Sequence, residues 1–403
     1  MRIPKTLAIP RTATVVFALG TAQTLAWGSS YYLPAILADP MAAGLGLPVS
    51  AVFGAFSAAL LLGALVGPLV GRVIDRSGGR GVLAASSLVL ATGLVLLAGA
   101  GGLAGLVLGW AAMGVGMAMG LYDPAFAALA RLYGAEARSK ITGITLFAGF
   151  ASTIGWPLSA VMLEAFGWRG ACLGWAVIQL LVCLPLYLSL PRAETAVAKP
   201  VDAPETPPAS PPPHAMGLLA FVFAVVAFNA GAIGAHLPGL FAAAGASPAA
   251  AVAAAALIGP AQVGARILEF SLLRRFHPLI AARIACLTHP AGAAVLALLG
   301  APGAAGFALL HGAGNGMLTI ARGTLPLAIF GPGGYGTRSG LLAIPARLAQ
   351  STAPVVFGLL VTGFGVGALW LSGGMALAAC GALMLLRTKK IEERRSSSTP
   401  AET

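Results

Sequence analysis

The chain has 403 residues, of which 58% are hydrophobic and 9% are charged, and its formal net charge is +12. A soluble domain has about 25% charged residues, so this composition excludes an ordinary soluble protein and predicts a polytopic protein embedded in a lipid bilayer. The positive charge does not indicate a nucleic-acid partner, because the basic residues lie in short loops and at the chain ends rather than along one helix face.

Apolar runs close to the roughly 20 residues that a membrane-spanning helix requires lie between charged or Pro- and Gly-rich breaks. The first six cover 12–36, 49–72, 80–100, 103–129, 141–165 and 168–190. The second six cover 216–241, 249–273, 279–300, 303–330, 339–362 and 364–387. The sequence therefore predicts an all-α membrane protein with twelve transmembrane helices.

A polar stretch ending in PETPPASPPPH separates the first six runs from the second six. Pro-rich segments with few apolar residues are typical of extended, disordered linkers. The predicted organisation is an N-terminal six-helix half over 1–190, a disordered cytoplasmic linker over 191–215, a C-terminal six-helix half over 216–387 and a cytoplasmic tail over 388–403.

The basic residues predict the orientation of these spans. With both termini in the cytoplasm, 20 of the 24 Lys and Arg residues fall on the cytoplasmic side and Arg169 alone on the other. Arg266, Arg322 and Arg347 remain inside spans. Because cytoplasmic loops of membrane proteins are enriched in Lys and Arg, we expect a multi-pass protein of a bacterial-type inner membrane with both termini cytoplasmic.

The first span carries a polar and aromatic face. Gln23, Trp27 and Ser30 are spaced four and three residues apart, which places them on one side of a helix. Together with Tyr31 they are predicted to line a substrate cavity, since aromatic and amide groups suit flat or polar ligands. The alternative for Tyr31 and its neighbour Tyr32 is an aromatic belt at the membrane surface.

The loop after the second span reads GRVIDRSGGR, from Gly71 to Arg80. It resembles the signature loop of the major facilitator superfamily, and departs from it at Gly79, where the family prefers a basic residue. The resemblance implies the major facilitator fold, with two pseudo-symmetric six-helix halves, and a gating role in which the loop ties span two to span eleven. The residues that match are Gly71, Asp75, Arg76, Gly78 and Arg80. The alternative is a basic cytoplasmic loop with glycine turns.

Span four contains the stretch GLYDPAF, with an aspartate and a proline inside an apolar run. Asp123 is a candidate for proton coupling, and its alternative is an ion pair with cytoplasmic basic residues. Pro124 is expected to kink the helix as part of a gate. A shift of 200 residues aligns GVGM of span four with GNGM of span ten and places Tyr122, a cavity candidate, opposite Arg322, while a shift of 198 aligns Phe166-Gly167 with Phe364-Gly365.

The second half supplies the remaining candidates. Ionisable residues inside a span are costly and are functional candidates by default. The cavity candidates are Arg266, His311, Asn315 and Arg322, and the proton-coupling candidates are Glu269 and His236. The region GMGLYDPAFAALARLYG to TGITLFAGFASTIGWPL, together with Arg266, also resembles monocarboxylate and oxalate–formate transporters. It departs from them at Gln262, where monocarboxylate carriers have an acid. A structural salt bridge between Arg266 and Glu269 is the alternative to a ligand site.

The sequence contains no phosphate-binding loop, no metal-spaced His or Cys set and no nucleophile motif, so no cofactor, no metal and no enzymatic activity are expected. The predicted function is secondary active transport of a small organic solute, anionic or polar, by alternating access, with protons as a candidate coupling ion and a monomer as the working unit. The alternatives are an efflux pump for drugs or toxic compounds such as arsenicals, and a non-transporting sensor with a transporter fold.

Overall fold

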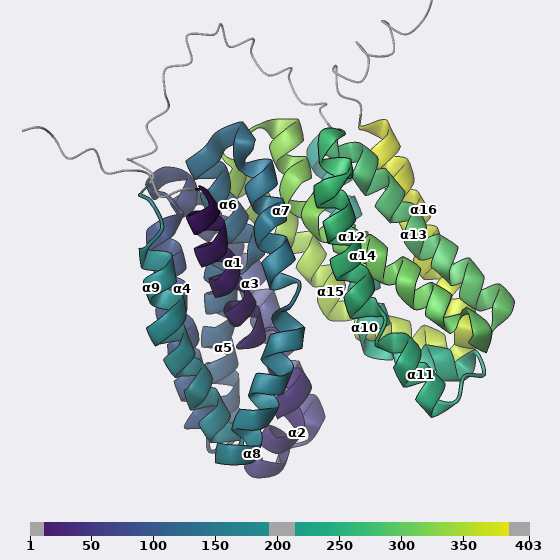
Figure 1. Ribbon diagram of the computed structural model, residues 1–403. Helices are drawn as coiled ribbons and strands as arrows, with labels where there is room; N and C mark the ends of the chain where they lie inside the picture. Colours follow the sequence, from purple (N-terminus) through teal and green to yellow (C-terminus); the bar gives the residue numbers. More distant parts are fainter. Residues whose placement is uncertain (1–11, 193–213, 387–403) are drawn as a thin grey trace, which may run out of the picture. The chain divides into compact units, whose positions relative to one another are not determined.

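The computed structural model describes residues 12–192 and 214–386, and every regular element in these residues is a helix. The chain divides into two compact units (Figure 1). Among the described residues, the first contains 12–192 together with 332–340, and the second contains 214–331 and 341–386. The predicted disorder of the linker and the tail concerns 193–213 and 388–403, which lie outside the described residues.

The first unit holds the helices of the N-terminal half. They are α1 (Thr12–Gly28), α2 (Pro34–Leu45), α3 (Val49–Ser77), α4 (Gly79–Ala98), α5 (Leu103–Gly120), α6 (Tyr122–Tyr133), η1 (Gly134–Glu136), α7 (Ala137–Ala148), α8 (Ala151–Ile178), the π-helical turn η2 (Gln179–Cys183) and α9 (Leu184–Leu188). Their core is formed by Leu, Met, Ala and Trp side chains of α1 to α5 and α8.

The second unit holds the helices of the C-terminal half. They are α10 (Ala215–Ala243), α11 (Pro248–Ala255), α12 (Ile258–Ser271), η4 (Leu273–Arg275), α13 (Pro278–Leu299), η5 (Ala301–Gly303), α14 (Ala304–Phe330), α15 (Tyr335–Phe364), η6 (Gly365–Gly367) and α16 (Ala368–Leu385). The first residues of α15, up to Gly340, belong to the first unit.

Seven segments of the described residues are long and apolar enough to cross a membrane. Two of them, Leu103–Leu188 and Tyr335–Leu385, each contain more than one of the predicted spans. Gly167 lies inside the first with a φ of 69°, and Gly365 lies inside the second with a φ of 55°. Glycine tolerates this left-handed backbone, so the chain bends between the spans predicted on either side. The total of twelve crossings stays a prediction.

Glycines allow α5 to pack closely on both of its neighbours, α3 and α4 (Figure 1). A Cβ at Gly114 would collide with the backbone of Ala59 on α3, and one at Gly116 would lie 2.7 Å from the side chain of Leu90 on α4. Small residues at such crossings bring helix backbones together, and close packing then drives helix association in a membrane.

The same arrangement in the second unit distinguishes the two offsets of the internal repeat. On α14, Gly312 meets the Ile258 carbonyl of α12, with a built Cβ at 2.8 Å, and Gly314 meets Ala285 of α13 at 2.9 Å. The glycines that contact the corresponding helices are therefore 198 residues apart, which favours the offset that the sequence shows for Phe166-Gly167 and Phe364-Gly365 over the 200-residue alignment of the two GxGM motifs. At an offset of 198 Tyr122 corresponds to Ile320, and at 200 it corresponds to Arg322.

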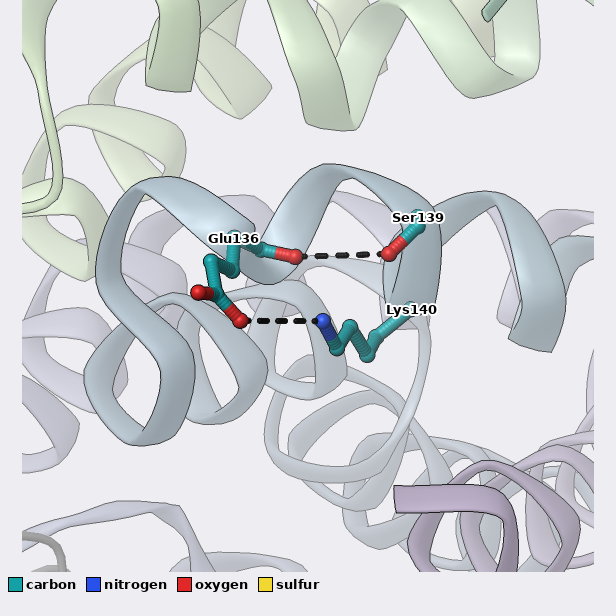
Figure 2. Close-up of polar contacts among 3 residues, drawn as sticks. All are labelled: Glu136, Ser139 and Lys140. Atoms are coloured by element: carbon teal, nitrogen blue, oxygen red, sulfur yellow. Dashed lines mark hydrogen bonds and ion pairs between the residues drawn. The ribbon is translucent and has the colours of Figure 1, made fainter.

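The loop between α6 and α7 carries an ion pair on its surface (Figure 2). Lys140 Nζ lies 3.5 Å from a carboxylate oxygen of Glu136, one helical turn away, and the Ser139 hydroxyl donates to the Glu136 carbonyl at 3.4 Å. The Glu136 side chain is 82% exposed, whereas the Lys140 side chain is 13% exposed, so water competes strongly for the carboxylate of the pair.

We therefore expect Glu136→Gln to change the free energy of unfolding by less than about 0.5 kcal/mol, because exposed i,i+4 pairs contribute little. Denaturant unfolding of the purified protein in detergent measures this. A loss above about 1 kcal/mol would show that the pair organises the loop beyond its own attraction.

Candidate functional site

The GLYDPAF stretch contains a helix break. Helix α5 ends at Gly120, Leu121 adopts extended angles (φ −86°, ψ −159°), and α6 begins at Tyr122. Pro124 lies in the first turn of α6, where backbone N–H groups have no acceptor inside the helix, so the N–H that proline lacks is not missed. The kink that the sequence predicts at Pro124 is therefore located at Leu121. Asp123 lies in the same first turn, where the helix dipole favours a negative charge.

The break frees the Gly120 carbonyl, which side chains from two other helices contact. Gln23 Nε2 of α1 donates to it at 2.5 Å, the Tyr187 hydroxyl of α9 lies 3.5 Å from it, and Gln23 Nε2 lies 3.3 Å from that hydroxyl. Gln23 and Tyr187 are fully buried. Backbone groups that a break releases inside a membrane must find such partners. Tyr187 had no signal in the sequence, because its partner lies 67 residues away.

Replacing Gln23 with leucine is expected to destabilise the protein by about 1–3 kcal/mol, because a buried carbonyl loses its short hydrogen bond. Ser77→Ala is the matched control, since the exposed Ser77 hydroxyl only donates to the Val73 carbonyl of its own helix. Denaturant unfolding of both variants measures the difference. Equal stabilities for the two variants would contradict the structural role of Gln23 at the break.

The predicted aromatic face of span one is part of a larger aromatic cluster in the first unit. Trp27 lies at its centre, with ring centroids 5.2 Å from Tyr31, 6.0 Å from Tyr32 and 4.9 Å from Tyr122. The chain of ring contacts extends to Phe56, Trp110, Phe126 and Trp156. Trp27, Tyr31, Tyr32 and Tyr122 are half-buried. The structure thus brings together three predicted cavity residues from α1, the turn that follows it, and α6.

Two polar groups, one at the end of α1 and one in the turn that follows it, differ in whether their donors are already used. The indole N–H of Trp27 is buried and has no hydrogen-bond acceptor among the described residues, so it can donate to a ligand. The Ser30 hydroxyl is also buried, but it donates to the Ala26 carbonyl in the last turn of α1 at 2.5 Å. Trp27 is therefore the stronger ligand candidate of the two.

The signature loop forms a cap on α15. The Asp75 carboxylate accepts three hydrogen bonds of 2.8 Å each, from the backbone N–H of Gly336, the backbone N–H of Thr337 and the Thr337 hydroxyl. These amides are in the first turn of α15, where backbone donors lack partners inside the helix and the dipole attracts an anion. The sequence predicted a tie between spans two and eleven, and the structure shows the atoms that form a contact between α3 and α15.

The close approach of α3 to α15 depends on glycine. A Cβ at Gly71 would collide with the Gly336 backbone, and one at Gly340 would lie 2.7 Å from Pro68. Gly78, with a φ of 85°, ends α3. Arg76 is exposed and Arg80 is half-buried. A Cβ at Gly79 would collide with Ala128 of α6, so a basic side chain does not fit where this loop departs from the signature.

In the second unit, α12 carries two buried charged side chains one turn apart. Arg266 is 5% exposed and Glu269 is 2% exposed. The Arg266 Nε lies 3.5 Å from the Gly316 carbonyl on α14. A Cβ added at Gly316 would lie 2.5 Å from the Gln262 backbone of α12. The missing side chain at Gly316 thus lets the guanidinium reach the α14 backbone.

A small cavity of about 30 Å³ lies among α10, α13, α14 and α16. His311 and Asn315, both predicted from the sequence, line it together with Asn229 and His289. His289 Nδ1 lies 2.8 Å from His311 Nδ1, and His289 Nε2 lies 3.1 Å from the Ser372 hydroxyl. His289 and Asn229 were missed because each is a single polar residue in an apolar run, which carries no spacing signal.

Two predicted residues of the second unit lie elsewhere. Arg322 is half-buried on α14, eleven residues beyond His311. His236 is half-buried on α10, and its Nε2 lies 2.6 Å from the Pro354 carbonyl of α15. Within the described residues, no group of three or more His, Cys, Asp or Glu side chains is arranged to hold a metal ion.

Long apolar helices in two units, with buried polar side chains in both and the buried charges of Arg266 and Glu269 in the second, are typical of a multi-pass membrane protein. A sequence profile of the Major Facilitator Superfamily matches residues 18–310. The chain therefore belongs to the Major Facilitator Superfamily, whose members are secondary transporters and not enzymes. Among curated proteins, no sequence matches closely enough to indicate a relative.

Solved structures share the fold at low sequence identity. The human organic anion transporter MFSD10 (TETRAN) aligns with a TM-score of 0.73 and 18% identity, covering 93% of this chain and 100% of that one. The transporter FucP in the outward conformation gives 0.70 and 16%, covering 94% and 100%. The proton:xylose symporter XylE bound to 6-bromo-6-deoxy-D-glucose gives 0.69 and 15%, covering 92% and 94%. These likenesses confirm the major facilitator fold.

Proposed function

We propose that the protein moves a small organic anion across a bacterial-type inner membrane by alternating access, as a monomer with both termini in the cytoplasm and with protons as the coupling ion. The observation that carries this proposal is the buried guanidinium of Arg266 in α12. Burying an ionisable side chain inside a span costs at least about 2.5 kcal/mol, so a position that keeps one has a reason to do so.

The chemistry of arginine favours an anionic substrate. A guanidinium stays charged under all physiological conditions and presents a planar fork of donors that matches a carboxylate or a phosphate. Arg322, half-buried on α14, is a second cation of the same unit. The name of the structural neighbour MFSD10, an organic anion transporter, agrees with this choice.

The aromatic cluster supplies the contacts for the organic part of the substrate. Trp27, Tyr31 and Tyr122 combine flat apolar faces with polar edges, and the buried Trp27 N–H is an available donor. The same cluster supports the second candidate function, efflux of flat toxic compounds such as drugs, since stacking on aromatic rings tolerates many ligands.

The Asp75 cap on α15 is the proposed gate. Alternating access requires contacts that form in one state and break in the other. Three hydrogen bonds to a carboxylate at a helix N-terminus are a strong and compact contact of this kind. The first turn of α15 would have to leave Asp75 for the gate to open.

The experiment that separates the two candidate functions compares a deletion strain with an overexpressing strain. Uptake of a panel of radiolabelled organic acids tests import, and growth on a panel of toxic compounds, including arsenicals, tests export. Loss of uptake on deletion supports the anion transporter. Hypersensitivity on deletion with unchanged uptake would replace it with the efflux pump.

Arg322→Ala tests the second arginine in the same assay. If Arg322 binds the anion, its removal is expected to raise the substrate KM by about tenfold or more, the value of one charge-assisted hydrogen bond. Transport with wild-type KM would remove Arg322 from the site and leave Arg266 as the substrate cation.

A further inference from the structure

His289 and His311 are not among the residues predicted to couple protons. The geometry of the pair fixes how many protons can lie between the two rings. The two Nδ1 atoms are 2.8 Å apart, and the residues are 6% exposed each. At this separation one Nδ1 must carry a proton and donate it, while the other accepts. The bridge between the rings therefore holds one proton, and a second proton there would force two N–H groups against each other.

The other proton of the neutral pair lies on Nε2, the outer nitrogen, of one of the two rings. A neutral pair has two protons on four nitrogens, and one of these protons is in the bridge. If His311 donates in the bridge, His289 carries its proton on Nε2 and donates it to the Ser372 hydroxyl, which in turn donates to the Leu369 carbonyl at 3.1 Å. If His289 donates, its Nε2 accepts from Ser372 and His311 carries the outer proton. One outer nitrogen is vacant in either arrangement.

We propose that His289 and His311 form a one-proton site that couples transport to protons, a step that rests on the proposed transport function. A proton binds the lone pair of the vacant outer nitrogen, and the bridging N–H bond can then shift from one ring to the other while the opposite outer N–H releases its proton. The pair thus alternates between neutral and singly charged forms, and each proton taken up on one ring is balanced by one proton released from the other ring, which leaves the bridging N–H on the opposite ring.

The cavity beside this pair is large enough to hold water. A volume of about 30 Å³ holds about two water molecules. Asn229, which lines the cavity, donates from Nδ2 to the Ser372 carbonyl at 3.1 Å, whereas its Oδ1 is buried and has no donor among the described residues. A buried amide oxygen without a donor indicates a cavity that holds water in the working protein.

Two contacts offset part of the cost of placing a single positive charge on this buried pair. The Phe307 ring lies 5.6 Å from the His311 ring and 5.9 Å from the His289 ring, within the range of a cation–π attraction. The N–H···N bridge also becomes charge-assisted and stronger when the pair is protonated. Protonation would therefore strengthen the connection between α13 and α14.

Among the described residues of the helices packed around the cavity, the histidine pair is the candidate proton site. Helix α13 adds Cys286 to the cavity wall and Arg283 further along, and α16 adds Cys380. Helix α12 faces α14 with Arg266 and Glu269, α14 itself adds Arg322, and α10 adds His236. Helix α11 has no ionisable side chain. Of these, only Cys286 lines the cavity, and thiols titrate above the histidine range.

The first test titrates the histidines directly and needs no substrate. Long-range ¹H–¹⁵N spectra of the full-length ¹⁵N-histidine-labelled protein, from about pH 8 to about pH 5, report the protonation of each ring nitrogen. Asparagine keeps one donor and one acceptor near the Nδ1 position and takes up no proton. We expect the two rings to titrate together with uptake of one proton in total. In His311→Asn or His289→Asn the remaining ring is expected to titrate alone, and the double variant is expected to take up no proton while the protein stays folded. Separate titrations, or no titration of either ring while the protein stays folded, would overturn the inference.

The second test uses proteoliposomes with a pH gradient and a substrate found by the strain comparison. Both His→Asn variants are expected to lose acceleration by the gradient and to keep downhill exchange of substrate, and His214→Asn, at an exposed position before α10, is the matched control. Full gradient-driven transport in either variant would refute the coupling role. If the wild-type protein transports no organic anion, the proposed substrate class is wrong. The histidine titration then still tests the one-proton site.

Discussion

Replacing Asp75 with alanine is expected to accelerate hydrogen–deuterium exchange at the backbone amides of Gly336 and Thr337 by about a hundredfold. The carboxylate accepts from both amides and from the Thr337 hydroxyl, each at 2.8 Å. Hydrogen bonds to a charged group contribute about 1.5–3 kcal/mol each, and water replaces part of that, so a net loss near 3 kcal/mol is reasonable. Mass spectrometry of peptides covering 332–340 measures the rate.

The same substitution is expected to change transport. If the cap stabilises one state of the alternating-access cycle, losing about 3 kcal/mol shifts the ratio of states by about a hundredfold. Turnover then falls because the protein stays in the opposite state. Transport that is slowed without faster amide exchange would place the effect of Asp75 outside the cap.

Two variants serve as controls for this result. Thr337→Val removes only the hydroxyl donor and keeps both amide bonds, so exchange is expected to rise by about fivefold, the equivalent of about 1 kcal/mol. Arg76→Gln changes an exposed side chain next to Asp75 and is expected to leave the exchange rate as in the wild type. Exchange in Asp75→Ala no faster than in Thr337→Val would contradict a cap held mainly by the backbone amides.

Arg266→Gln is expected to lower anion transport by about a hundredfold, because removing a buried, hydrogen-bonded charge costs about 2–5 kcal/mol. Arg266→Lys keeps the charge but presents a point cation instead of a planar fork, so a loss of about tenfold is expected. Initial uptake rates in proteoliposomes, at equal amounts of inserted protein, measure both effects.

A double variant separates a substrate ligand from a structural ion pair. Glu269 lies one turn from Arg266 and is equally buried, so Arg266→Gln alone leaves a carboxylate without its neighbouring cation. Arg266→Gln with Glu269→Gln removes both charges and relieves that penalty. If Arg266 binds the anion, the double variant folds normally and still fails to transport. Recovery of transport in the double variant would assign Arg266 to a structural pair.

The sequence by itself determined the class of the protein and the character of its elements. A membrane span must satisfy its backbone within the helix and cover itself with apolar side chains, and both requirements are local. The multi-pass all-α fold was therefore confirmed, as was the superfamily, which the loop from Gly71 to Arg80 indicated through a short and specific motif.

The tertiary structure decided which polar groups meet. Asp75 and Gly336 are 261 residues apart, Gln23 and Tyr187 are 164 apart, and His289 and His311 lie on different helices. Hydropathy predicts which side chains are buried away from the lipid, but the hydrogen-bond partner of each side chain depends on which helix faces pack together. Close glycine contacts set those faces, and for this reason the choice between the offsets of 198 and 200 residues depends on the packing of α5 and α14.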